Sequence, residues 1–180
     1  MNNKIHHLQD VNNEMLAYYF NDLKSDTTIF FFGGYSSDMT GTKATALNNW
    51  TESNGINYLR FDYSGHGQSS GDLGKGTLSS WLGEAEFFFE KFKSKKNMII
   101  GTQMCGWIAL LTALKNIEVN GLIGMGSAPE FTKNEWDRIY KILKSICKKI
   151  PVSLDTRKSE IMEKGIKLGD QIINDVYGLR

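Results

Sequence analysis

Four continuous apolar runs are the strongest pattern in the chain. They are Thr27 to Phe32, Ile56 to Tyr63, Met98 to Gly101 and Val119 to Met125. Runs of this length, rich in β-branched and aromatic residues, are typical of strands buried on both faces of a parallel sheet. The chain before them contains two strand-like segments, 4–8 and 14–20, separated by the turn-rich residues 10–13, which predicts an N-terminal hairpin.

Segments with helical spacing separate these runs. In the clearest, Thr77 to Lys93, apolar residues recur every three or four positions. A second helix is predicted over Thr40 to Ser53, with Ala44, Leu47 and Trp50 on one face. Because strands alternate with helices, we expect parallel βαβ units with right-handed crossovers, and therefore an α/β fold.

The pattern changes after Pro129. Two amphipathic helices are predicted, Asn134 to Ile150 and Lys158 to Asn174, and no further strand follows. This leaves Val119 to Met125 as an edge strand that is apolar and has neither Lys nor Pro to discourage pairing. We therefore expect self-association at this edge, or a partner chain that covers it.

Composition and charge describe an ordinary globular chain. The 180 residues fit one domain, 1–180, with 41% hydrophobic residues and a net charge of +1. This balance gives no basic surface for nucleic acid. The two cysteines, the absence of a membrane-length apolar stretch and the polar start of the chain favour a cytoplasmic protein without a disulfide framework. No motif indicates a cofactor or a metal.

The chemistry of the chain centres on Gly101-Thr102-Gln103-Met104-Cys105-Gly106, which follows an apolar run and opens an apolar helix. This is the strand–turn–helix context of a G-x-S-x-G nucleophile elbow. Here Gln103 stands in place of the serine and Cys105 in place of the second glycine. A primary amide has no ionisable group that a base could activate, so the predicted site lacks a nucleophile.

Several motifs together resemble the α/β-hydrolase superfamily, and in particular its small-esterase branch of palmitoyl-protein thioesterases and acyl-glucuronide esterases. The segments that carry the resemblance are 32–44, 60–69, 76–77 with Trp81, 101–110, 121–124 and 128–131. The resemblance implies ester or thioester hydrolysis through an acyl-enzyme, on a mostly parallel sheet with a helical lid over 130–157. It also implies that the last strands of the fold are missing, so that the fold is truncated.

The resemblance also assigns roles to individual residues. Backbone amides at the turn after Gly34, at Tyr35, and after the elbow apex, at Met104, would form the oxyanion hole. Another loop, containing Asp62, Ser64 and His66, would support the site. In the family the nucleophile is followed by an acid and then a histidine, whereas none of the three histidines here follows the elbow.

These departures favour an inactive member of the family. Two alternatives remain: a binding module that retains an acyl pocket, and one part of a split serine hydrolase completed by another chain. Among other candidates, Cys105 is more plausible as a small buried residue than as a thiol nucleophile, and His66 as a loop anchor than as a base. Asp62 and Asp72 are expected to cap turns rather than to bind a metal.

Overall fold

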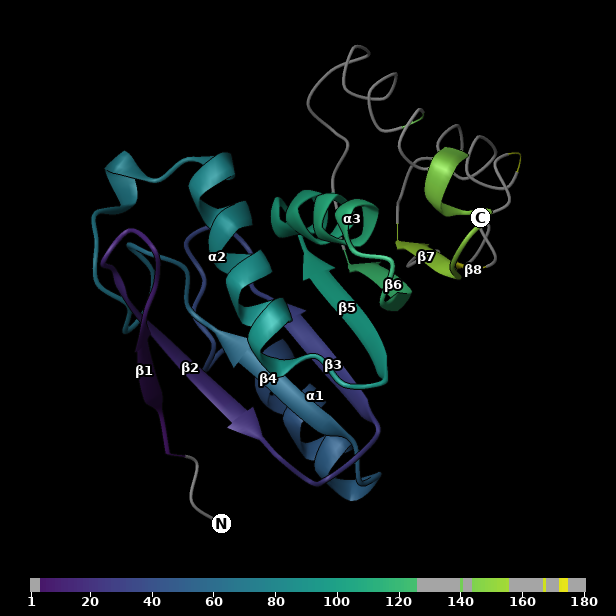
Figure 1. Cartoon of the computed structure of the whole chain (residues 1–180), viewed down its shortest axis with the longest axis horizontal. Helices are drawn as coiled ribbons and strands as arrows, with labels where there is room; N and C mark the ends of the chain where they lie inside the picture. Colours follow the sequence, from purple (N-terminus) through teal and green to yellow (C-terminus); the bar gives the residue numbers. More distant parts are fainter. Residues whose placement is uncertain (1–3, 126–139, 141–143, 156–166, 168–171, 175–180) are drawn as a thin grey trace.

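The structure is a computed structural model of the chain, and it describes residues 4–125, 140, 144–155, 167 and 172–174. These residues form one mixed sheet of eight strands in the order β1-β2-β4-β3-β5-β6-β7-β8 (Figure 1). The strands are β1 (His6–Gln9), β2 (Met15–Asn21), β3 (Thr27–Phe32), β4 (Asn57–Phe61), β5 (Lys96–Thr102), β6 (Val119–Met125), β7 (Val152–Asp155) and β8 (Ile172–Asn174). The helices are α1 (Thr42–Ser53), the short 3-10 helix η1 (Leu73–Lys75), α2 (Leu78–Phe92) and α3 (Cys105–Lys115).

The predicted hairpin and parallel core are confirmed. The first two strands, β1 and β2, form an antiparallel pair, and β2 joins the sheet antiparallel to β4. The other pairings, from β4 through β3, β5, β6 and β7 to β8, are all parallel. The four apolar runs form the four central strands, because a strand covered on both faces can bury side chains that point to either face.

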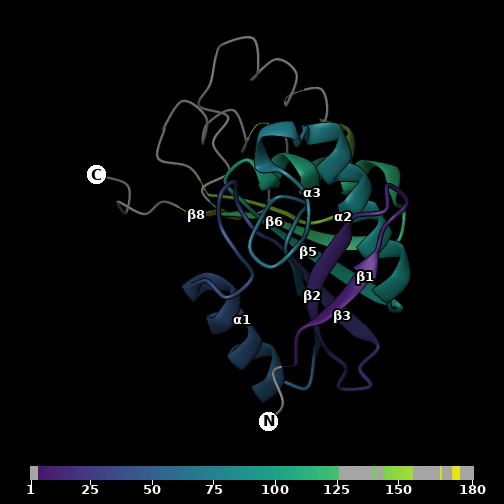
Figure 2. The same ribbon diagram turned by 90° about the vertical axis from the view of Figure 1, so that its left-hand side faces the viewer.

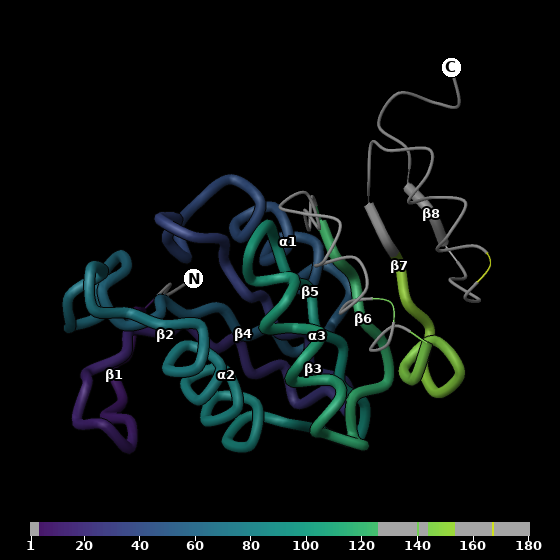
Figure 3. Tube along the Cα trace, turned by 90° about the horizontal axis from the view of Figure 1, so that it is seen from above, coloured from purple at the N-terminus to yellow at the C-terminus, as the bar shows by residue number. Residues whose placement is uncertain are grey.

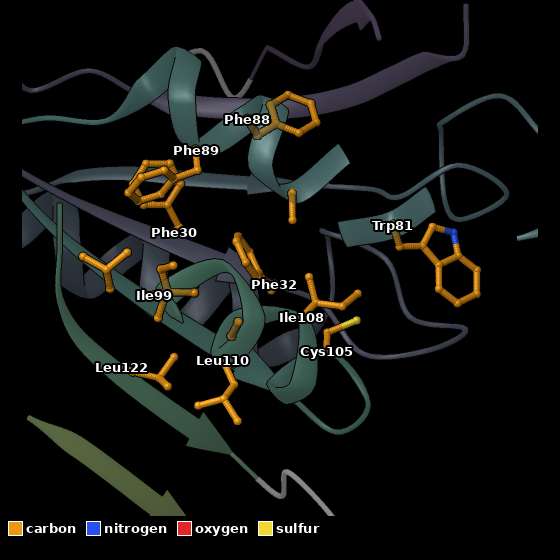
Figure 4. Close-up of a cluster of buried hydrophobic side chains, with 14 of the residues drawn as sticks. Phe30, Phe32, Trp81, Phe88, Phe89, Ile99, Cys105, Ile108, Leu110 and Leu122 are labelled. Carbon is orange, nitrogen blue, oxygen red and sulfur yellow. The ribbon is translucent and has the colours of Figure 1, made fainter. Parts of the chain in front are cut away.

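Helices cover both faces of the sheet. Helices α2 and α3 lie side by side on one face, and α1 lies on the other (Figures 2 and 3). Alternation along β3 serves both layers: Phe30 and Phe32 belong to the core beneath α2 and α3, whereas Ile29 and Phe31 belong to the core beside α1. Figure 4 shows the larger of these cores, in which side chains of α2, α3, β3 and β5 pack together.

Helix α2 begins and ends where the sequence predicts. The Thr77 hydroxyl accepts the amide of Ser80 at 3.1 Å, and the Ser80 hydroxyl accepts the amide of Thr77 at 3.0 Å, which is a reciprocal N-cap. Helix α1 differs in its orientation. Its buried residues are Ala44, Asn48 and Thr51, while Trp50 is 53% exposed. Trp50, predicted to share one face with Ala44 and Leu47, therefore lies outside the buried face of the helix.

The expectation that no strand follows β6 is also wrong. Strand β7 pairs with β6 in parallel, with Leu122 opposite Val152 and Gly124 opposite Leu154. Strand β8 then pairs with β7, with Asp155 opposite Asn174. Residues 172–174, which were assigned to a helix, are thus a strand. Strand β6 is an internal strand in this sheet, so an exposed β6 edge cannot be the basis for self-association.

The predicted lid, 130–157, is only partly described. Residue 140 and residues 144–146 are helical, 147–149 form a turn, and 152–155 are strand β7. The helical segment therefore ends before Pro151, and the rest of the predicted lid and of the Asn134 to Ile150 helix lies outside the described residues. Among the described residues, no helix is long and apolar enough to cross a membrane.

Candidate functional site

The elbow has the predicted geometry. Only Gln103 and Met104 separate β5 from α3, and Gln103 adopts a left-handed φ of 50°. This conformation is unfavourable for a residue with a side chain. The backbone amide of Gln103 donates to the Met125 carbonyl at 3.1 Å, and the backbone carbonyl of Gln103 accepts the amide of Gly106 at 3.1 Å. Bonds to β6 on one side and to α3 on the other therefore hold the strained turn.

Close packing around Gly101 makes this sharp turn feasible. A Cβ atom at Gly101 would lie 2.6 Å from the carbonyl oxygen of Cys105 and 2.7 Å from the Cβ of Ala109. Helix α3 therefore starts directly against the last residues of β5. A larger residue at position 101 would push the helix away from the strand and change the direction of the turn.

The two turns at the carboxyl ends of β3 and β5 lie next to each other. Phe32 pairs with Gly101, and the hydroxyl of Thr102 donates to the carbonyl of Phe32 at 3.4 Å. The loop after Phe32 therefore meets the elbow, and the Gln103 side chain reaches Gly34. In the described part of the chain, no hydrogen bond uses the backbone amide of Tyr35 or of Met104. The two amides assigned to the oxyanion hole are thus both available.

Asp62 supports the first of these turns from within the protein. It is 2% exposed, and its carboxylate accepts the amides of Met39 at 2.6 Å and Gln68 at 2.9 Å. Burial raises the pKa of Asp62, while the two amides act against this. Gly67 approaches so closely that a Cβ there would lie 2.1 Å from a carboxylate oxygen. The carboxylate therefore joins the loop after β3 to the loop after β4.

Ser64 has a structural environment rather than a catalytic one. Its amide and hydroxyl both donate to the carboxylate of Glu84, at 2.9 and 2.5 Å. Glu84 is 2% exposed, and burial raises its pKa. The Ser64 carbonyl accepts Trp81 Nε1 at 3.2 Å and His66 Nδ1 at 3.1 Å. Every polar group of Ser64 is thus used to fix the loop to α2.

His66 lies among aromatic rings and is 5% exposed. Its ring centroid is 5.2 Å from Trp81, 5.9 Å from Tyr35 and 6.1 Å from Tyr63. Because a carbonyl can only accept, His66 Nδ1 carries a proton, and Nε2 is buried without a partner among the described residues. These contacts fit the loop anchor that the sequence predicts. His6 and His7 are exposed on β1.

Cys105 is in the first turn of α3 and is 1% exposed. Burial raises the pKa of its thiol to about 12, so the thiolate is essentially absent near neutral pH. The prediction of a small buried residue is confirmed. Asp72 accepts the amide of Gly74 at 2.9 Å and caps η1, as expected. Within the described part of the chain, no group of three His, Cys, Asp or Glu side chains could hold a metal ion.

Sequence reasoning missed Glu84, on which the Ser64 loop depends. It lies within the apolar face of α2, together with the buried residues Trp81, Ala85 and Phe88. An acidic residue in an otherwise apolar helical face is a signal that could have identified it, because a buried carboxylate requires hydrogen-bond donors. Arg60 was also missed; it is buried and donates to the carbonyl of Met39 at 2.9 Å.

Comparison with solved structures defines the class of fold. The chain is similar to the α/β-hydrolase domain-containing protein 10 from mouse, with a TM-score of 0.72 and 21% identity, over 96% of this chain and 88% of that one. It is also similar to an esterase of Pyrococcus furiosus, with a TM-score of 0.75 and 17% identity, over 96% of this chain and 81% of that one. The chain therefore has the α/β-hydrolase fold.

Sequence comparison narrows the resemblance to one branch. The chain is 31% identical over 139 residues to the mitochondrial palmitoyl-protein thioesterase ABHD10 of Homo sapiens, covering 77% of this chain and 41% of that protein. It is 34% identical over 103 residues to the corresponding protein of Rattus norvegicus, covering 57% of this chain and 35% of that protein. The chain thus spans about two fifths or less of the length of these relatives. Its homologues are thioester hydrolases, which confirms the predicted resemblance.

A different family matches the end of the chain. The sequence model described as "Pterin binding enzyme" matches residues 123–180. Of these residues, the structure describes the end of β6, the segment containing β7, and β8. The match to human ABHD10 spans 139 residues, more than the 122 that precede position 123, so the two similarities overlap in the chain.

Proposed function

We propose that the chain is a non-hydrolytic protein with the α/β-hydrolase fold that binds an acyl group through its carbonyl oxygen. The observation that carries this proposal is the elbow itself. Its backbone geometry is retained, and the amides of Tyr35 and Met104 have no partner among the described residues, but its apex is Gln103. Two free backbone donors at adjacent turns suit a carbonyl or carboxylate oxygen whether or not a nucleophile is present.

The state of each candidate nucleophile supports the proposed absence of hydrolysis. The side-chain amide of Gln103 cannot be activated by a base. The Cys105 thiol is buried and protonated, and the Ser64 hydroxyl is bound to Glu84. The histidines add no base, because His6 and His7 are on β1 and His66 is buried among aromatic rings. Gln103 also argues against the split-hydrolase alternative, because a second chain would not supply the missing hydroxyl.

Inactivity can be tested with the purified chain. We expect no hydrolysis of p-nitrophenyl or thioester acyl substrates above buffer, and no labelling by a serine-directed fluorophosphonate. A thioesterase such as ABHD10, assayed in parallel, provides the positive control. Saturable turnover by this chain would contradict the proposal.

Acyl binding needs a separate measurement. We expect octanoate to bind to the chain and to shift the amide resonances of Tyr35 and Met104 in a nuclear magnetic resonance titration. Shifts confined to other parts of the chain would place the acyl group elsewhere. No binding at millimolar octanoate would leave the protein without the proposed activity.

The family match at the end of the chain favours a second candidate function, pterin binding. Strands β7 and β8 are consecutive, parallel and adjacent, and Asp155 and Asn174 occupy paired positions at their carboxyl ends. Ligand sites in parallel sheets commonly lie at this end of the strands.

The two candidates predict different ligands. Pterin fluorescence should be quenched on binding, and an excess of octanoate should leave this quenching unchanged. Unchanged pterin fluorescence at all protein concentrations would remove the second candidate. We also propose that the chain is cytoplasmic, which fractionation of its host cell would test.

A further inference from the structure

The side chain of Gln103 covers Gly34. Its Oε1 atom lies 2.4 Å and its Cδ atom 3.2 Å from the position that a Cβ on Gly34 would occupy. Gly34 does not have a left-handed φ, so its glycine is not required by backbone conformation. The space that a Cβ would take at position 34 is instead filled by the amide of Gln103.

Gly34 immediately precedes Tyr35, one of the two residues whose backbone amide has no partner among the described residues. On its other side, the carbonyl of Gly34 accepts the amide of Ser37 at 3.1 Å and the hydroxyl of Ser37 at 2.5 Å, which fixes the turn. The Gln103 side chain therefore places a carbonyl oxygen over a fixed turn whose next amide is unoccupied. A carbonyl oxygen is also the group that an acyl ligand would bring to this turn.

We infer that Gln103 is a specificity-determining residue that competes with the ligand: its side-chain amide occupies the place where the acyl carbonyl or carboxylate would bind. This inference rests on the acyl binding proposed above. The elbow favours such competition because the left-handed φ of 50° at the apex directs the side chain out of the turn and toward the loop after β3. The serine of an ordinary elbow is too short to reach across Gly34 in this way.

A ligand can displace the side chain of Gln103 from its position over Gly34. Gln103 is exposed, and within the described residues no hydrogen bond holds its side-chain amide. A ligand that binds here must therefore displace a neutral amide whose hydrogen bonds to water cost little to exchange. The side chain thus reduces affinity without abolishing it, and the reduction applies only to ligands whose acceptor oxygen needs this space.

Removing the side chain should reveal the competition. We expect Gln103→Ala to bind octanoate about tenfold more tightly than the wild type, which corresponds to about 1.4 kcal/mol. Gln103→Glu is the matched control: it keeps the size of the side chain and adds a negative charge, so it should show no gain. Octylamine should bind equally to the wild type and to Gln103→Ala, because an ammonium group has no acceptor oxygen.

A second substitution tests whether the space itself is responsible. In the Gln103→Ala background, Gly34→Ala places a methyl group where the amide oxygen had been, and it should abolish the tenfold gain. Circular dichroism melts would show that all variants remain folded.

The outcomes separate the inference from the proposed function. Equal octanoate affinity in the wild type and Gln103→Ala would overturn the inference and leave acyl binding intact. A gain in Gln103→Ala that survives Gly34→Ala, or that extends to octylamine, would also overturn it. If none of the proteins binds octanoate, both the inference and the proposed function fail.

Discussion

The carboxylate of Asp62 accepts the backbone amide of Met39 at 2.6 Å, and both residues are 2% exposed. The same carboxylate accepts the amide of Gln68 at 2.9 Å. One buried side chain thus determines how the loop after β3, which carries Tyr35, lies against the loop after β4, which carries His66. The available amides of the candidate site therefore depend on a residue that need not touch a ligand.

Replacing Asp62 by Asn should destabilise the protein markedly. The amide of Asn has a single acceptor oxygen, so its NH2 group would face one of the two backbone donors. Hydrogen bonds to a charged group contribute about 1.5–3 kcal/mol each, and we expect a loss of about 2 kcal/mol in the free energy of unfolding. Urea denaturation measures this loss. Asp72→Asn, at the exposed cap of η1, should cost less than about 1 kcal/mol; equal losses would refute the special role of Asp62.

A second prediction concerns the packing that makes the elbow sharp. Gly101→Ala should destabilise the fold by about 1–3 kcal/mol, because its methyl group would meet the backbone of Cys105 and Gly106. Gly83→Ala in α2 is the control, because a Cβ there meets nothing within 4 Å. In that helix the same change should stabilise by about 0.5–1 kcal/mol. Thermal melts of both variants should therefore shift in opposite directions, and a neutral Gly101→Ala would contradict the packing argument.

Much of this fold could be predicted from periodicity. Strand β3 was evident because six consecutive β-branched or aromatic residues can be buried only in a strand covered on both faces. Strands β7 and β8 could not be predicted from periodicity. Their lengths, four residues in β7 and three in β8, are too short to show an alternating pattern. Ile172 and Ile173 also suited the spacing of the preceding amphipathic segment, which led to the incorrect helix.

In the candidate site, too, only features that are local in sequence could be predicted. The elbow was identified from Gly101 and the strand–turn–helix context, since that motif is local in sequence. Contacts between segments distant in the chain could not be predicted, and these include Glu84 with Ser64 and Asp62 with Met39. The position of the Gln103 side chain over Gly34 depends on both the left-handed turn and the register of β3 with β5, so no sequence pattern encodes it.

The pKa of Glu84 gives a prediction for pH dependence. Burial raises this pKa above the ordinary value of 4.5, so the folded state holds the proton more tightly than the unfolded state. This contribution to stability is fully present below pH 4.5 and is lost as the pH rises through the folded pKa. The burial of Asp62 acts in the same direction, from an ordinary value of 3.8.

Glu84→Gln removes one of these two groups and can keep hydrogen bonds to the amide and hydroxyl of Ser64. We expect the free energy of unfolding of this variant, relative to the wild type, to increase as the pH rises from 4.5 toward 7. Urea titrations at several pH values measure the difference. A relative stability of Glu84→Gln that falls with pH would show that the carboxylate is stabilised when charged.

The last prediction concerns repair of the elbow. Gln103→Ser restores the missing hydroxyl at the apex, next to the free amides of Tyr35 and Met104, yet we expect no efficient hydrolysis. No histidine follows the elbow in this sequence, and a serine without a base to accept its proton retains only residual activity. Hydrolysis of p-nitrophenyl octanoate and fluorophosphonate labelling are the two measurements, with ABHD10 as the active reference.

Turnover of Gln103→Ser at the level of the reference would contradict this expectation and would require a base within the chain. His66 is then the first residue to examine, because its ring contacts that of Tyr35. Gln103→Ser combined with His66→Gln would lose that activity if His66 were the base. Loss of activity accompanied by unfolding would instead reflect the anchoring of the loop, and a melt of the double variant distinguishes the two causes.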